Sequence, residues 1–288
     1  MSTAITSARR PRRSASRILR TKGLPLLLLL VALIGVGVPF VMAVAWSLVD
    51  PDNPWSFPDA LPPSLSTYPW EYVFNYTPIV DAIATSFSLA TAATILAFLL
   101  SLPTAYAIGR YEFRAKGLIR ILLLIPLILP GMVVALFLSR IFISFGLAQT
   151  FQGLVIGHTL LGLPFMSRLL TTSFEAVPRE VSDAASNLGA SELVKFREIY
   201  IPMILPGIFA GSIFTFITSL EEFSLTFVIG TPTYQTIPTI LYGFLGYHFV
   251  RTQAAVASLI LLVPNVVLLV IADRMLKRDV VSAAYAKL

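Results

Sequence analysis

Long runs of apolar residues alternate along the chain with short charged segments. A helix that crosses a hydrocarbon core of ~30 Å needs about 20 predominantly apolar residues. Six such runs predict transmembrane helices over about residues 24–48, 82–108, 118–138, 147–166, 203–220 and 254–272. The pattern therefore predicts an all-α, polytopic membrane protein, because a helix satisfies its own backbone hydrogen bonds within lipid.

Composition supports this fold class and excludes several others. Of the 288 residues, 56% are hydrophobic and 12% are charged, and a soluble domain carries roughly twice that share of charge. A compact soluble enzyme and a disordered chain are both inconsistent with these values. The chain has no cysteine, which excludes disulfides, thiol nucleophiles and cysteine-ligated metal sites.

Basic residues are distributed very unevenly between the two predicted sides of the membrane. Nineteen of the 21 Lys and Arg fall on one side, including seven in the first 22 residues, and only Arg140 and Arg251 fall on the other. The positive-inside rule therefore predicts that both termini are cytoplasmic. We expect residues 1–23 to form a basic cytoplasmic arm that touches anionic membrane lipid, not nucleic acid, and residues 24–288 to form the membrane domain.

Two features near the N-terminus leave alternatives open. Ala43-Val44-Ala45 imitates a signal-peptide cleavage site, but the apolar run is longer than an h-region of ~7 to 15 residues, so an uncleaved anchor is expected. The following segment, about residues 49–80, is rich in proline and aromatic residues. It is either an interfacial aromatic belt or a docking surface for an extracytoplasmic partner.

The apolar runs offer little chemistry. His158 is the only ionisable residue well inside a predicted span, and a lone histidine there is more often an interhelical hydrogen-bonding residue than a base or ligand. We expect no catalytic residues and no metal site. There is no glycine-rich phosphate loop, so the chain itself is expected to bind no nucleotide or other cofactor.

The stretch from about residue 168 to 201, predicted to be cytoplasmic, holds nine of the chain's 36 formal charges. Pro178 suits the start of a short amphipathic helix and Gly189 suits its left-handed C-terminal stop. Ser191 can cap a second short helix, and Pro202 predicts a bend into the fifth span. The alternative is a helix that lies on the bilayer surface.

This stretch resembles the cytoplasmic signature of type I ABC importer permeases. The family pattern of Glu-Ala-Ala, glycine, isoleucine and Leu-Pro is matched in spacing by Asp183-Ala184-Ala185, Gly189, Ile199 and Ile201-Pro202. Asp for the leading Glu and Ile for the Leu are the two departures. The six spans and the position of the motif between spans four and five agree with the family.

The resemblance implies a cytoplasmic coupling helix between helices 4 and 5. It would seat in a groove of a separate ABC ATPase dimer, which would hold ATP and Mg. The ATPase-coupling residues would be Asp183, Ala184, Ala185, Leu188, Gly189, Ile199 and Pro202. The resemblance also implies an extracytoplasmic solute-binding protein, a second permease subunit that is a different chain, and a bacterial inner-membrane location.

Glu221 and Glu222 end the fifth span and are candidates for the substrate path. With Ser219 to Ile229 and Thr236-Ile237-Pro238, they are similar to the spermidine/putrescine branch of the family. Carboxylates at a gate favour a cation, which predicts a polyamine or related organic cation. Alternatives are a pair of solvated carboxylates, importers of aminophosphonates, opines or ferric iron, and a secondary transporter.

Overall fold

The computed structural model describes residues 23–56, 58–248 and 250–285, with side chains up to Arg274. The predicted basic arm, except for Gly23, and the C-terminal basic side chains from Lys277 onward lie outside this description. Within it the chain is helical, with one isolated bridge between Val49 and Leu65 and no strand. The elements are α2 Leu24–Ser47, α3 Tyr68–Tyr76, α4 Ile79–Arg110, α5 Lys116–Ile128, α6 Gly131–Ser144, α7 Phe151–Ala176, α8 Arg179–Asn187, α9 Glu192–Lys195, the π-helical turn η2 Phe196–Tyr200, α10 Ile201–Glu221, the π-helical turn η3 Thr226–Gly230, α11 Ile237–Tyr242, the π-helical turn η4 Gly243–Tyr247 and α12 Arg251–Tyr285.

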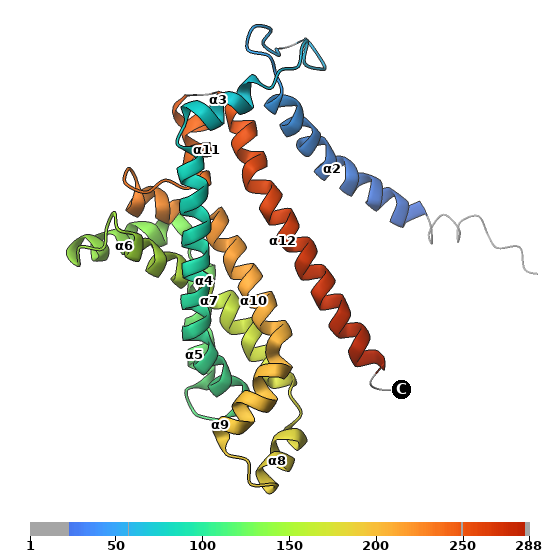
Figure 1. Cartoon of the computed structure of the whole chain (residues 1–288), viewed down its shortest axis with the longest axis vertical. Helices are drawn as coiled ribbons and strands as arrows, with labels where there is room; N and C mark the ends of the chain where they lie inside the picture. Colours follow the sequence, from blue (N-terminus) through green and yellow to red (C-terminus); the bar gives the residue numbers. More distant parts are fainter. Residues whose placement is uncertain (1–22, 57, 249, 286–288) are drawn as a thin grey trace, which may run out of the picture.

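Five of the described helices are long and apolar enough to cross a membrane, and they correspond to five of the six predicted spans. The third predicted span, over about residues 118–138, falls on a bent pair of helices and not on one helix. Helices α5 and α6 meet there at 104°, and Figure 1 shows α6 projecting sideways. Leu129 is extended because Pro130 follows it, and Pro130 also lacks the N–H that a continuous helix would use. A sixth crossing exists only if the bent pair counts as one span.

Two boundaries between spans four and five also differ from prediction. Helix α7 continues to Ala176, so the loop expected from about residue 168 begins inside a helix. The helix of the fifth span begins at Glu192 and not at about residue 203, so Pro202 lies within it, and Tyr200 and Ile201 keep helical backbone angles. The wide π-helical turn before Pro202 accommodates the missing hydrogen bond.

Helices α4, α7 and α10 pack together as the centre of the molecule. Ala97, Leu170 and Ile204 are fully buried where the three helices meet. Gly207 and Gly211 of α10 face α7, and a Cβ at either position would collide with the side chain of Ser173 or Met166. Small residues at these points let the two backbones approach closely, which is how helices associate within lipid.

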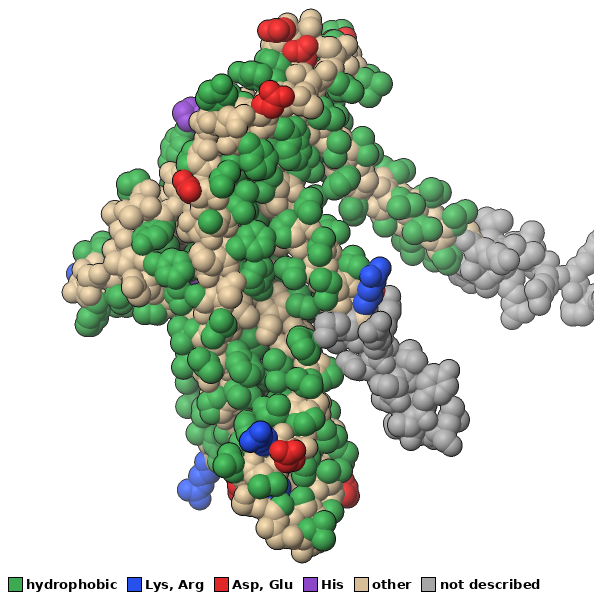
Figure 2. Space-filling view, viewed as in Figure 1, with side chains coloured by type: hydrophobic (Ala, Val, Ile, Leu, Met, Phe, Trp, Pro, Cys, Tyr) green, Lys and Arg blue, Asp and Glu red, His purple; other side chains and the backbone are tan. Residues whose placement is uncertain are grey.

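The most apolar helix lies on the outside of this arrangement. Helix α2 contacts α12 at its C-terminal end, where Arg251 lies over the ring of Trp46, and diverges from α12 toward Leu24 (Figure 1). No residue of its apolar window is buried. In contrast, 56% of the window in α7, the least apolar of the five helices, is buried. Figure 2 shows hydrophobic side chains over the flanks of the helices and acidic side chains gathered at the end that carries α3. We call the two ends of the molecule the α3 end and the α8 end.

Candidate functional site

The segment from Val177 to Tyr200, which we call the α8 junction, joins α7 to α10 at the α8 end (Figure 1). Gly189 has a φ of +81°, and its N–H donates to Ser186 O at 3.0 Å. The N–H of Ala190 donates to Ala185 O at 3.0 Å. These two bonds satisfy the last carbonyls of α8, so the predicted glycine stop is confirmed. The predicted cap is also confirmed, because Ser191 accepts a hydrogen bond from Val194 N.

Polar side chains on the inner face of α8 attach it to the start of the long helix that follows. Ser182 Oγ and Tyr200 Oη lie 2.8 Å apart in a buried hydrogen bond. Lys195 Nζ donates to Ser186 Oγ at 2.9 Å and pairs with Glu192 Oε1 at 2.5 Å. The short helix is therefore held by specific bonds, and not only by its covalent linkers.

An arginine at the end of α4 fixes the other side of the junction. Arg110 donates through Nη1 to Val177 O at 2.7 Å and to Phe174 O at 3.4 Å, which satisfies carbonyls at the end of α7. Its guanidinium also lies over the ring of Tyr200, 5.0 Å from the centroid. Tyr106 completes this aromatic platform, with its ring 5.3 Å from those of Phe174 and Tyr200.

Sequence reasoning missed Arg110 and its aromatic partners. The available signal was a basic residue at the end of a predicted span, which the positive-inside rule explains without any specific contact. Its partners come from α4, α7 and η2, so only the folded arrangement brings them together.

The outer face of α8 is exposed. Asp183, Ala184 and Leu188 all lie on it, and 88% of Leu188 is accessible. Leu193, on the following turn, is 76% accessible. We call Asp183, Ala184, Ala185, Leu188 and Gly189 the α8 tip. The other motif residues, Ile199 and Pro202, lie in the long helix that follows the α8 tip, on the side toward the centre of the molecule. Ile199 packs against the central core there.

Glu222 lies at the far end of α10, in a segment that we call the Glu222 junction, residues 219–230. Its side chain is only 7% exposed. Its two carboxylate oxygens accept hydrogen bonds from Leu225 N at 2.8 Å and Thr226 N at 3.2 Å. The carboxylate therefore caps the turn that begins η3, which satisfies two backbone N–H groups.

His158 joins the same cluster from α7. Its Nδ1 lies 2.8 Å from Ser219 Oγ, its Nε2 lies 3.0 Å from Thr226 Oγ1, and Nε2 is 3.6 Å from Glu222 Oε2. The residue is buried and joins α7 to α10 and η3, as predicted for a structural histidine. No group of three or more His, Asp or Glu side chains converges as a metal site among the described residues.

Glu221 faces the opposite way from its neighbour. It is exposed, and its Oε1 accepts a hydrogen bond from Asn265 Nδ2 of α12 at 2.7 Å. The other side-chain atom of that amide, Asn265 Oδ1, is buried and has no hydrogen-bond partner among the described residues. The two carboxylates thus do not form one site. The carboxylate of Glu221 and the Oδ1 atom of Asn265 can accept hydrogen bonds from a ligand that carries donors.

An aromatic hollow opens near the α3 end, between α3, η3, α11 and η4. Phe227, Tyr72 and Tyr247 are among its lining residues, together with Gln235 and Gln253. Two of the lining rings, Phe227 and Tyr247, belong to an aromatic cluster with Phe223 and Tyr242. Its ring centroids lie 4.8 to 5.5 Å apart, in stacked, tilted and edge-on pairs. No Asp, Glu, Lys or Arg lines it among the described residues. Aromatic faces of this kind attract organic cations.

Comparisons with known proteins agree with this architecture. Residues 97–280 match the family model of binding-protein-dependent transport system inner membrane components. The spermidine/putrescine transport system permease protein PotC of Escherichia coli is 26% identical over 210 residues, 73% of this chain and 79% of PotC. The sulfoquinovosyl glycerol transport system permease protein SmoH of Agrobacterium fabrum is 27% identical over 217 residues, 75% of each chain.

A solved structure shares the fold. It is a crystal structure of a bacterial ABC transporter involved in the import of alginate, and its matched chain superposes with a TM-score of 0.73. The match covers 92% of this chain and 99% of the other, at 16% sequence identity. At that identity the likeness concerns the fold and not the solute.

Proposed function

This chain belongs to the family of binding-protein-dependent transport system inner membrane components, as a permease of an ABC importer for a small solute, and we propose that the solute is a polyamine or related organic cation. We further propose that ATP and Mg are held by a separate cytoplasmic ATPase dimer. A second, different permease subunit and an extracytoplasmic binding protein would complete the importer. In this arrangement the α8 end and both termini face the cytoplasm of a bacterial cell.

The α8 junction is the observation that carries the proposed coupling to an ATPase. Leu188 and Leu193 expose apolar surface beside Asp183 at the extreme end of the molecule. An exposed apolar tip on a rigid, hydrogen-bonded support is suited to seat in a groove of another protein. Closure of the ATPase dimer would displace α8, and the bonds of Arg110 and Tyr200 would pass that displacement to α7 and α10.

Substitution of the α8 tip tests this role. We expect Leu188→Asp and Gly189→Asp to abolish uptake and the coupling of ATP hydrolysis to transport, with membrane insertion unchanged. Leu188→Asp is the sharper variant, because its side chain is exposed whereas any side chain at Gly189 strains a positive φ. Phe113→Asp, at an exposed apolar residue in the loop between α4 and α5, is the matched control. Normal uptake by Leu188→Asp would contradict the proposal.

The proposed solute class rests on two places where a cation finds partners. The aromatic hollow offers ring faces, and no Lys or Arg is among its described lining residues. Glu221 and the unpartnered Asn265 Oδ1 offer acceptors for an ammonium group further along the molecule. Asn265 lies 12 residues beyond Gln253 in α12, a separation of about 18 Å. A cation would therefore meet the hollow first and the carboxylate second.

Competition against uptake distinguishes the solute classes. We expect spermidine or putrescine to compete with the native solute, and a neutral glycoside, an aminophosphonate, an opine or ferric citrate to have no effect. Glu221→Gln should weaken uptake of the cation, while Glu112→Gln, at an exposed carboxylate between α4 and α5, serves as the charge-matched control. Unchanged cation uptake by Glu221→Gln, or competition by the glycoside alone, would contradict the solute assignment without affecting the test of the α8 tip.

A further inference from the structure

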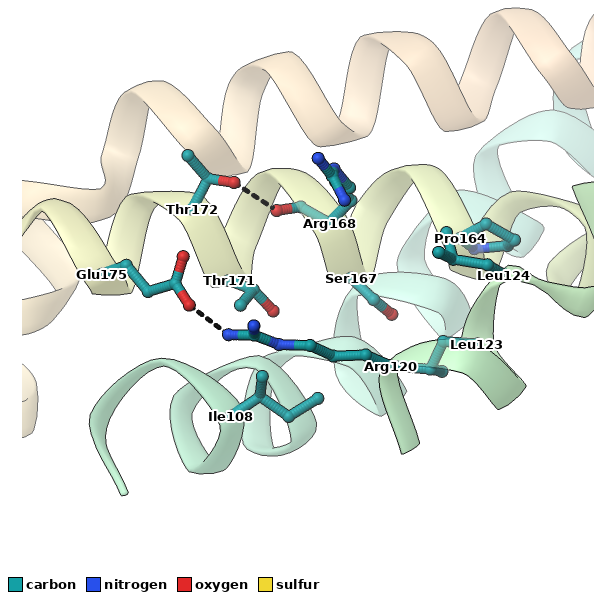
Figure 3. A pocket seen from close by; sticks show the side chains of 10 residues that line it. All are labelled: Ile108, Arg120, Leu123, Leu124, Pro164, Ser167, Arg168, Thr171, Thr172 and Glu175. Atoms are coloured by element: carbon teal, nitrogen blue, oxygen red, sulfur yellow. Dashed lines mark hydrogen bonds and ion pairs between the residues drawn. The ribbon is translucent and has the colours of Figure 1, made fainter. Parts of the chain in front are cut away.

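A second cavity lies between α5 and α7, with one wall from α4, towards the α8 end (Figure 3). It is distinct from the α8 tip and from the aromatic hollow, and neither proposed role uses it. Its lining residues are Ile108, Arg120, Leu123, Leu124, Pro164, Ser167, Arg168, Thr171, Thr172 and Glu175. The cavity therefore combines two arginines and three hydroxyl-bearing side chains with an apolar wall.

The two arginines differ in their partners. Figure 3 shows Arg120 directed toward Glu175, with which it forms an ion pair. Arg168 lies apart from that pair on α7, is exposed, and has no ion-pair partner among the described residues. With one carboxylate against two guanidinium groups, the lining has a net positive charge. A bare guanidinium on a membrane-spanning helix favours an anionic partner.

Arg168 also lies well within α7. It precedes the end of that helix at Ala176 by eight residues, or about 12 Å along the axis. Its neighbours on the surface are apolar, because Phe165 and Leu169 of α7 and Phe214 of α10 line an adjoining hollow. Apart from Arg168, the residues that line this second hollow are apolar, and it shares Leu124, Pro164 and Arg168 with the first.

The charged cavity and the adjoining apolar hollow together indicate which kind of molecule could bind there. A charged cavity that continues directly into an apolar groove matches a molecule with an anionic head and a hydrocarbon chain. A free inorganic anion would leave the apolar groove unfilled. A lipid of zero net charge would leave the excess positive charge of the cavity without a counter-charge. Basic pockets between helices near the cytoplasmic surface are a known means of recognising lipid head groups.

We propose that this two-part cavity binds an anionic phospholipid. The phosphate contacts the guanidinium of Arg168, with a further hydroxyl donor available from Thr171, whereas Thr172 Oγ1 already donates to Arg168 O at 3.0 Å. One acyl chain follows the groove of Phe165, Leu169 and Phe214. The site is independent of the transported solute, since it requires only that the chain is embedded in a membrane.

Lipid binding to the purified full-length protein, with whatever subunits copurify, tests the proposal. In native mass spectrometry from mild detergent, we expect phosphatidylglycerol to bind in preference to phosphatidylcholine. Arg168→Gln should weaken phosphatidylglycerol binding about fivefold, as expected for loss of one basic residue at a lipid surface. Arg140→Gln, an equal loss of charge at an exposed position of α6, should leave binding unchanged.

Three results would overturn the proposal. One is equal binding of phosphatidylglycerol and phosphatidylcholine to the wild-type protein. Another is displacement of phosphatidylglycerol by inorganic phosphate or glycerol phosphate at matched concentration, which would identify a site for free anions. The third is wild-type affinity in Arg168→Gln. If that variant fails to fold, Arg168→Lys should keep the preference for phosphatidylglycerol, and the first two measurements need no variant.

Discussion

The α8 junction and the Glu222 junction lie at opposite ends of α10, and both turn polar groups inward, but they differ in what they leave exposed. At the α8 junction, polar contacts face inward and the apolar side chain of Leu188 faces outward. At the Glu222 junction, a carboxylate is turned inward against His158 and two backbone N–H groups. The first leaves its outer surface free for a partner, whereas in the second the hydrogen-bonding capacity of Glu222 is used within the chain.

This difference predicts which substitutions should impair transport without lowering stability, and which should lower the free energy of unfolding. Removal of exposed surface at the α8 tip costs little folding free energy, because Leu188 contacts little of its own chain. Removal of a buried, hydrogen-bonded carboxylate leaves donors without partners and costs folding free energy directly.

Glu222→Ala is expected to have the largest effect. It leaves the N–H groups of Leu225 and Thr226 without acceptors and removes the neighbour of His158, so we expect a loss of about 3 kcal/mol in unfolding free energy. Thermal unfolding in detergent measures it. Glu221→Ala is the adjacent control, and it should cost far less because that carboxylate is exposed. Equal losses in the two variants would remove the distinction between the two carboxylates.

Arg110→Gln should cost about 2 kcal/mol, since it removes a charged donor from two carbonyls at the end of α7. We also expect reduced coupling of ATP hydrolysis to uptake, because α8 would lose part of its support. Arg114→Gln, an exposed basic residue four positions on, is the charge-matched control. The interpretation fails if both variants have the same thermal stability and the same coupling ratio.

The hydrogen bond between Ser182 and Tyr200 should contribute about 1 kcal/mol. A double-mutant cycle with Ser182→Ala and Tyr200→Phe measures it, because each variant removes one hydroxyl from the same bond. We expect the double variant to be no less stable than the worse single variant. Additive losses would mean that the two hydroxyls act independently and that α8 is held by other contacts.

The smallest effect is expected at Glu112, an exposed carboxylate between α4 and α5. The hydrogen bond from Lys116 at 2.8 Å holds the pKa of Glu112 below its ordinary value of 4.5. Its contribution to stability is therefore present above that ordinary value and is lost as pH falls through the lowered one. Glu112→Gln should be slightly less stable than wild type at pH 7 and equal to it below that range. A difference that grows on acidification would contradict this sign.

The sequence predicted the parts of the fold that depend on local pattern. Apolar runs gave five helices, and the properties of Gly189 and Ser191 gave the stop and cap of the α8 junction. The bend between α5 and α6 was missed because Pro126 and Pro130 both interrupt an apolar run, and helices within a membrane tolerate many prolines. Nothing local distinguishes the proline that breaks the helix from the one that stays within it.

The directions of the side chains at the candidate sites could not be predicted from the local sequence pattern either. Glu221 and Glu222 are adjacent and identical in chemistry, yet one faces Asn265 and the other faces His158. Their directions are set by the point at which α10 ends, because Glu222 leaves the helical conformation and Glu221 does not. The contacts of Arg110 likewise depend on residues more than 60 positions away.

The close approach of α7 and α10 at Gly207 and Gly211 has a mechanical consequence. Two helices whose backbones are in such close contact cannot slide past one another easily, so α7 and α10 are expected to move as one rigid body. The contacts of Arg110 and Tyr200 attach one end of this body to α4 and α8. Helix α10 contains 21 residues and is therefore about 30 Å long. A tilt of only a few degrees at the α8 end would swing the Glu222 end through a distance comparable to the width of a water molecule.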